Sequence, residues 1–119
     1  MRRIPLKSEK IRLFGQPEDT PDVTFSYASN LIGIMNASAT ERGLPLSEIN
    51  KTLRVIAAVD QGARDGAENI VLEDADWEHL KKLVESFRAW RIVHQIVPAF
   101  VKDIIEAVAF EYPAEPKGA

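Results

Sequence analysis

The stretch Leu72–Val84, LEDADWEHLKKLV, is the clearest structural signal in the chain. Its acidic residues come first and its lysines follow, which is the charge order that a helix dipole favours. Trp77, Leu80 and Val84 recur at steps of three and four, as on one face of an amphipathic helix. The β-rich residues 70–72 are too few for a helix and predict a short strand before it. The charges of this stretch are therefore explained by a helix start, without any catalytic role.

Two further helices are expected upstream. The first lies within Val23–Ser38 and is capped by Thr24. Gly33 either weakens its middle or lets another backbone approach closely. Its apolar stripe contains Phe25, Ala28, Leu31, Ile32 and Met35.

The second upstream helix is expected at Glu48–Gln61, after a break at residues 39–47. Ser47 is its predicted N-cap, and Gly62 is the residue expected to end it. Its core-facing stripe is predicted from helical spacing to contain Ile49, Leu53 and Ile56.

The two ends of the chain complete the expected fold. Residues 3–14 predict a β-hairpin in which Leu6 pairs with Ile11 and Ile4 with Leu13, with Pro5 at an edge. A last helix is predicted at Val97–Phe110. The resulting fold class is α+β, mainly α, with an N-terminal β-hairpin packed on about four helices. We expect one domain over residues 1–112 and a disordered tail at residues 113–119.

The bulk composition restricts the function classes. With 119 residues, 45% apolar and 28% charged, the chain is typical of a globular domain. It has no Cys, no apolar leader and no membrane-spanning run, which predicts a soluble cytoplasmic protein with no membrane partner. The net charge of −3 disfavours a general nucleic-acid binder.

No motif in the chain identifies a reaction, a cofactor or a metal site. Glycine-rich phosphate loops and nucleophile elbows are missing, and the acidic DADWEH segment has His79 where a calcium loop needs Gly. Asp76 and Lys82 flank His79 in the predicted helix, which indicates a surface position. His94 is expected to cap or line the junction of the last two helices. We therefore predict that the protein is not an enzyme.

Two groups of residues are candidate binding sites. Aromatic rings beside cations can stack a base and hold a phosphate. That chemistry points to a small anionic ligand such as a nucleotide, at Trp77, Lys81, Arg88, Trp90, Arg91 and His94. The alternative is that these Trp rings are core and the cations its rim. The last two helices also carry more apolar residues than one face needs, which predicts an interface that includes Phe87, Trp90, Phe100 and Ile104.

The order of segments resembles a known layout. A β segment, a helix, a capped helix and the helix start at residues 70–82, IVLEDADWEHLKK, follow one another. This order is similar to that of small accessory proteins of tailed phages and prophages, over roughly residues 1–110. The resemblance implies a non-enzymatic, oligomeric viral protein for virion or tail assembly, or for counteracting a host defence. Its place would be the bacterial cytoplasm or the virion.

The sequence therefore predicts a self-associating protein-interaction module, with itself and a phage or host protein as partners. One alternative is the nucleotide binder, which would sequester a defence signal. The other is a helix-turn-helix DNA-binding regulator. For that motif the connection at residues 39–47 is long, and the second helix carries only Lys51 and Arg54 outward.

Overall fold

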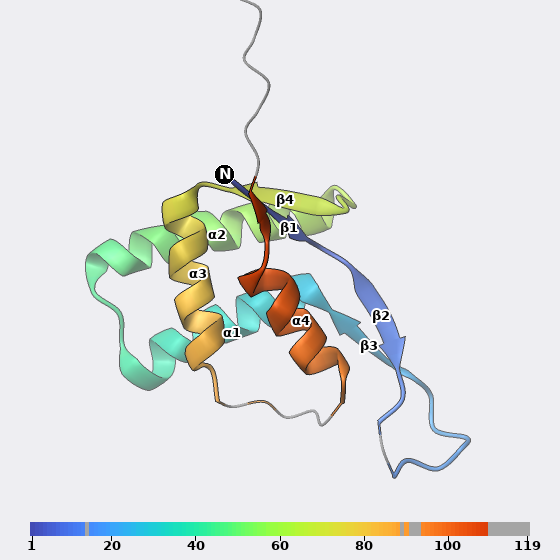
Figure 1. Cartoon of the computed structure of the whole chain (residues 1–119). Coiled ribbons are helices and arrows are strands. Elements are labelled where there is room, and N and C mark those ends of the chain that lie inside the picture. Colours follow the sequence, from blue (N-terminus) through green and yellow to red (C-terminus); the bar gives the residue numbers. More distant parts are fainter. Residues whose placement is uncertain (14, 89, 91–93, 110–119) are drawn as a thin grey trace, which may run out of the picture.

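The structure is a computed structural model that describes residues 1–13, 15–88, 90 and 94–109, with only the backbone of residues 41 and 42 (Figure 1). Within these residues the expected fold class is confirmed: helices predominate, and N-terminal strands pack on them. The predicted disordered tail at 113–119 lies outside the described residues.

Five short strands form two small sheets. In the first, β1 (Arg2–Pro5) lies between β4 (Asn69–Leu72) and β5 (Val108–Ala109), antiparallel to both. In the second, β2 (Ser8–Ile11) pairs with β3 (Val23–Ser26). This second pair is a hairpin that projects from the helical body in Figure 1.

The predicted hairpin over residues 3–14 is therefore wrong in its pairing. Only Leu6 and Lys7 separate β1 from β2, and the chain does not turn back there. The Leu6 amide instead donates to Glu68 O (2.8 Å), and Lys7 O accepts from the Tyr27 amide (3.0 Å). These two bonds extend both ladders, so one long strand passes from the first sheet into the second.

The first helix, α1, spans Tyr27–Arg42 and begins later than expected. Thr24 lies in β3, and the cap is Ser26, whose hydroxyl accepts from the Ser29 amide (3.3 Å). Gly33 is exposed, and no atom of another element would meet a Cβ there. The prediction that Gly33 lets another backbone approach closely is therefore wrong.

The second helix, α2, spans Leu46–Arg64 and is longer than predicted at both ends. Pro45 precedes it and supplies no side-chain cap, so Ser47 is not the N-cap. Gly62 lies inside the helix, packed against Ile70 and Leu6, and does not end it.

The last two helices, α3 and α4, lie in the C-terminal half of the chain. The third helix, α3, spans Asp74–Ser86 directly after β4, as predicted from the opening stretch. Its apolar stripe ends early, because Phe87 is extended (φ −70°, ψ 130°). The fourth helix, α4, spans Ile96–Ile105. The prediction that it continues to Phe110 is wrong, because Val108 and Ala109 form β5 and pair with β1.

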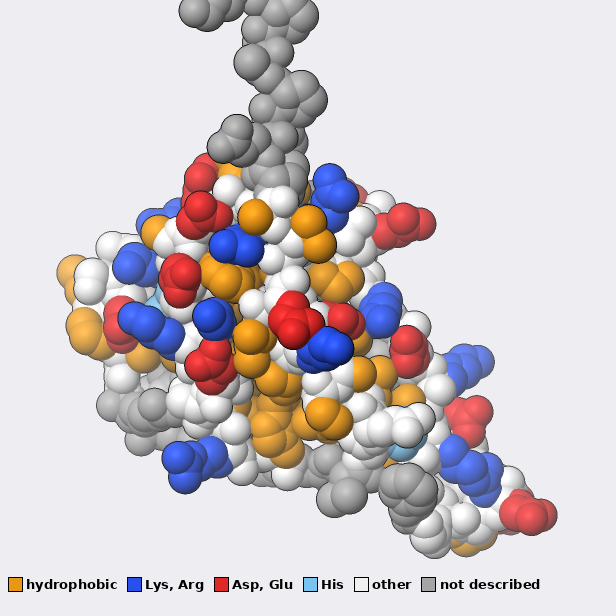
Figure 2. All heavy atoms as spheres, in the orientation of Figure 1, with side chains coloured by type: hydrophobic (Ala, Val, Ile, Leu, Met, Phe, Trp, Pro, Cys, Tyr) orange, Lys and Arg blue, Asp and Glu red, His pale blue; other side chains and the backbone are white. Residues whose placement is uncertain are grey.

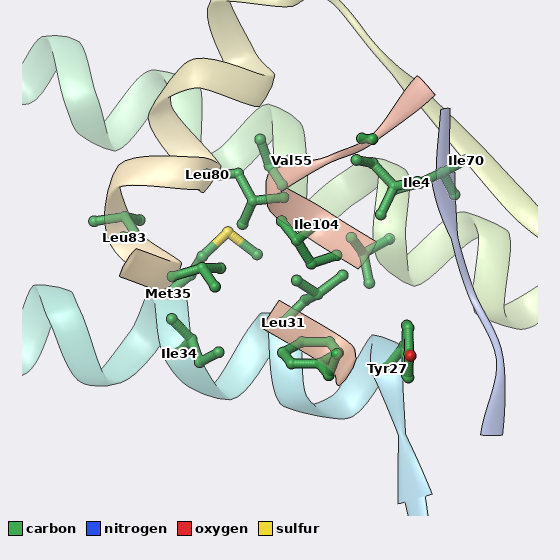
Figure 3. Packing of buried hydrophobic residues seen from close by; sticks show 14 of the residues in the cluster. Ile4, Tyr27, Leu31, Ile34, Met35, Val55, Ile70, Leu80, Leu83 and Ile104 are labelled. Atoms are coloured by element: carbon green, nitrogen blue, oxygen red, sulfur yellow. The ribbon is translucent and has the colours of Figure 1, made fainter. Parts of the chain in front are cut away.

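The hydrophobic core lies where the helices and the first sheet meet. Figure 3 shows side chains from α1, α2, α3, α4 and β1 converging there. α2 contributes Val55 and Val59, both 0% exposed, whereas the predicted stripe residue Leu53 is 58% exposed. Fully buried residues also include Ile4, Tyr27, Leu31, Met35, Leu80, Phe100 and Ile104.

Candidate functional site

The residues predicted to bind an anionic ligand do not form one site. Trp77 is buried near the start of α3, between the Arg2 guanidinium (4.1 Å from the ring centroid) and the Lys81 amine (5.2 Å). Its indole N–H donates to Ile104 O (2.9 Å). Trp77 is therefore a core residue with cations stacked on it, as the alternative interpretation predicted.

Three other members of that group, Arg88, Trp90 and His94, lie beyond the opposite end of α3. Trp90 packs edge-on against Phe87, at 4.9 Å between ring centroids. At about 1.5 Å per helical residue, Phe87 is roughly 15 Å along the chain from Trp77. His94 Nδ1 accepts from the Ile96 amide (3.0 Å), so it caps α4 as expected. Arg88 is exposed, and Arg91 lies outside the described residues.

The predicted interface also needs correction. Phe100 and Ile104 are 0% exposed, because they fill the core between α1, α3 and α4. They cannot meet a partner while the protomer keeps this fold. Phe87 and Trp90 are half-buried and keep part of their surface.

The face of α2 that the sequence predicts to face the core is in fact partly exposed. Leu46 is 76% exposed and Leu53 is 58% exposed. Ile49 and Ile56 are half-buried and fall in the same row at steps of three, four and three. We call these four residues the α2 strip. Figure 2 shows hydrophobic side chains at the left edge of the molecule, over the start of α2.

A buried polar group lies on the other side of α2. His79 is 6% exposed, which corrects the predicted surface position. The Thr52 hydroxyl donates to Glu48 O (2.8 Å), so it accepts from His79 Nε2–H (2.7 Å). Burial lowers the pKa of His79, which keeps its ring neutral.

Asp76 is the second buried polar residue of α3. Its carboxylate, 9% exposed, accepts from Arg54 Nε (3.1 Å) and Nη2 (2.8 Å) in a bidentate pair. This pair joins α2 to α3 and is a structural contact between the two helices.

A cavity of about 250 Å³ opens beside His79. It lies between the end of α1, the connection to α2, and α3. Its polar lining includes Ser38, Glu48, His79 and Lys82. The Ser38 hydroxyl is buried and has no hydrogen-bond partner among the described residues. We call this space the Ser38 cavity.

Comparison with protein-family models, curated protein sequences and solved structures finds no match in any of the three. Among the described residues, no cluster of His, Asp or Glu side chains is arranged to hold a metal ion. No helix in the same part of the chain has the length and apolar character needed to cross a membrane.

Proposed function

We propose that this protein is a non-enzymatic interaction module that self-associates through the α2 strip. The exposure of Leu46 and Leu53 on one helix face carries the proposal, because isolated exposed leucines are common but aligned ones mark contact sites. The steps of three, four and three in this strip are the heptad spacing of helix pairs. The order of segments along the chain resembles that of phage accessory proteins, which suggests a role in virion or tail assembly, or in counteracting a host defence.

The apolar side of α4 is the competing surface. Val97, Val101 and Ile105 are half-buried there, and Figure 2 shows hydrophobic side chains along the boundary between α3 and α4. Val97 and Val101 already pack on the core, so a partner would cover little additional area on them. Leu46 and Leu53 offer more uncovered area per residue, which favours α2.

The charges of α2 favour an antiparallel pair with a second copy. Asp60 continues the row seven residues after Leu53, so a parallel pair would place two Asp60 carboxylates face to face. An antiparallel pair centred on Leu53 places Asp60 beside the partner's helix start instead. That end carries positive dipole charge, and Pro45 leaves it without a side-chain cap.

The size of the α2 strip predicts weak association. Covering the exposed parts of Leu46 and Leu53 contributes about 2–4 kcal/mol per copy, at the usual 1.5–3 kcal/mol for a whole leucine. Association itself costs at least about 4 kcal/mol. At most about 4 kcal/mol then remains for a pair of copies, so the expected Kd is on the order of 1 mM, which suits a module that works at high local concentration.

Sedimentation equilibrium from about 20 μM to about 1 mM tests the proposal. The wild-type protein should show a monomer–dimer equilibrium, and Leu53→Glu should remove it. Val108→Glu is the matched control, because Val108 is 64% exposed on β5, away from α2. A wild-type monomer at the highest concentration refutes the proposal. Loss of the dimer in the Val108 variant alone would move the interface to the sheet edge.

The DNA-binding alternative gains one feature and lacks another. The connection between α1 and α2 is only Gly43–Pro45, shorter than expected and within the range of a helix-turn-helix. Part of the outward face of α2 is nevertheless the apolar α2 strip. Arg54 is held by Asp76, and Arg64 pairs with Asp60 (3.1 Å), so few cations remain for phosphates.

A further inference from the structure

The Ser38 cavity contains a donor that nothing in the described structure satisfies. Ser38 is 3% exposed, and its hydroxyl has no partner. A buried hydroxyl without a hydrogen bond costs free energy, and native proteins avoid that cost unless the group is used. Ser38 is one of the residues that line the cavity, so its side chain lies next to the space that a bound molecule would fill.

Two opposite charges line the same cavity. Glu48 comes from the first turn of α2 and Lys82 from α3. Neither side chain has an ion-pair or hydrogen-bond partner among the residues whose side chains are described. Glu48 is close enough to affect the titration of His79. The cavity therefore offers a site for a cation and a site for an anion.

The remaining lining limits the size and shape of an occupant. Leu44 and Leu83 are apolar residues of the lining, and His79 also lines the space, with its Nε2 held by Thr52. A volume of about 250 Å³ is below the range of roughly 300–1,000 Å³ for drug-sized ligands. It is too small to enclose a nucleotide and fits a molecule of a few heavy atoms.

We propose that the Ser38 cavity binds a free α-amino acid. Glu48 would accept from its ammonium group, Lys82 would donate to its carboxylate, and the Ser38 hydroxyl would find the partner that it lacks. Leu44 and Leu83 would contact a small side chain. This inference does not depend on the association through α2.

The first test is an NMR titration of the full chain with each of the twenty free amino acids at millimolar concentration. At least one should give saturable shifts at the amides of Ser38, His79 and Lys82. Its amide derivative lacks the carboxylate and its N-acetyl derivative lacks the ammonium, so both should bind at least about tenfold more weakly. No saturation with any amino acid, or equal binding of the amide, overturns the proposal. Equal binding of the amide would point to a peptide N-terminus instead.

Substitutions give an independent test. Glu48→Gln and Lys82→Gln should each weaken binding about tenfold or more, whereas Glu78→Gln, an exposed carboxylate of α3, should not. Ser38→Ala should weaken binding but leave the thermal midpoint of the free protein equal or higher, because the orphan hydroxyl is removed. Ser29→Ala, on the exposed side of α1, is its control. A lower midpoint for Ser38→Ala would show that the hydroxyl is structural and overturn its assigned role.

Discussion

Replacing Gly62 by Ala should destabilise the protein, although Ala is the better helix former. Gly62 is inside α2, where intrinsic propensity alone would favour Ala by about 1 kcal/mol. A Cβ at this position would lie 2.5 Å from Ile70 Cγ2 and 2.8 Å from Leu6 Cδ1. Both distances are shorter than van der Waals contact, so α2 or β4 has to move.

The magnitude follows from how easily those two atoms can yield. Leu6 Cδ1 is the end of a flexible side chain and can rotate away. Ile70 Cγ2 is a branch methyl next to the strand backbone, with its rotamer restricted. Overpacking of this kind costs about 1–3 kcal/mol, and we take the upper part of the range. After the propensity gain, the free energy of unfolding should fall by about 2 kcal/mol.

Gly33→Ala is the matched control for this substitution. Gly33 is also inside a helix, but it is exposed and a Cβ there meets nothing within 4 Å. This variant should gain about 0.5–1 kcal/mol, so the two Ala variants should differ by about 3 kcal/mol in urea unfolding. If Gly62→Ala is as stable as the wild type while Gly33→Ala behaves as expected, the packing of α2 on β4 described here is wrong.

Three further outcomes follow from buried polar groups. Burial lowers the pKa of His79 below its ordinary 6.5, so stability should fall as the pH drops below about 6.5, and His79→Gln should flatten that part of a urea-midpoint profile. Trp77→Phe should cost about 1–3 kcal/mol in urea unfolding, because it removes the buried hydrogen bond from the indole to Ile104 O and part of a buried ring. Burial and the hydrogen bond to Asp103 (2.6 Å) raise the pKa of Tyr27. Stability should therefore decline as the pH rises above about 10, and Tyr27→Phe should reduce that decline in thermal melts at alkaline pH.

The strand and helix at and around Leu72–Val84 could be predicted because several local signals agree there. The β-rich residues 70–72, the acidic first turn and the spacing of Trp77, Leu80 and Val84 all indicate a strand followed by a helix. The structure has β4 and α3 at those positions, with all three side chains buried. Local propensity, charge order and packing pattern give the same result when no distant element competes.

The N-terminal pairing could not be predicted because its partners are distant in sequence. Ile4 pairs with Ile70, and Glu9 pairs with Phe25. A four-residue turn between two alternating segments looks like a hairpin, since alternation shows which side chains share a face but not which strand lies alongside. β1 pairs with β4, and the position of β4 depends on how the preceding helix α2 packs in the fold. Local sequence patterns do not contain that information.

The candidate sites were missed for the same reason, and α2 shows it most clearly. The helix carries two apolar rows: the α2 strip, and a row with Val55 and Val59 about a quarter of a turn or more away. Helical spacing is compatible with either row as the core face. The larger Leu and Ile side chains favour the α2 strip, because larger apolar side chains gain more from burial. The structure places the smaller Val residues inside, because Gly62 on that side lets β4 approach closely. Larger side chains on that side would separate α2 from β4, so the same constraint that puts small residues in the core leaves the larger leucines outside, available to a second copy.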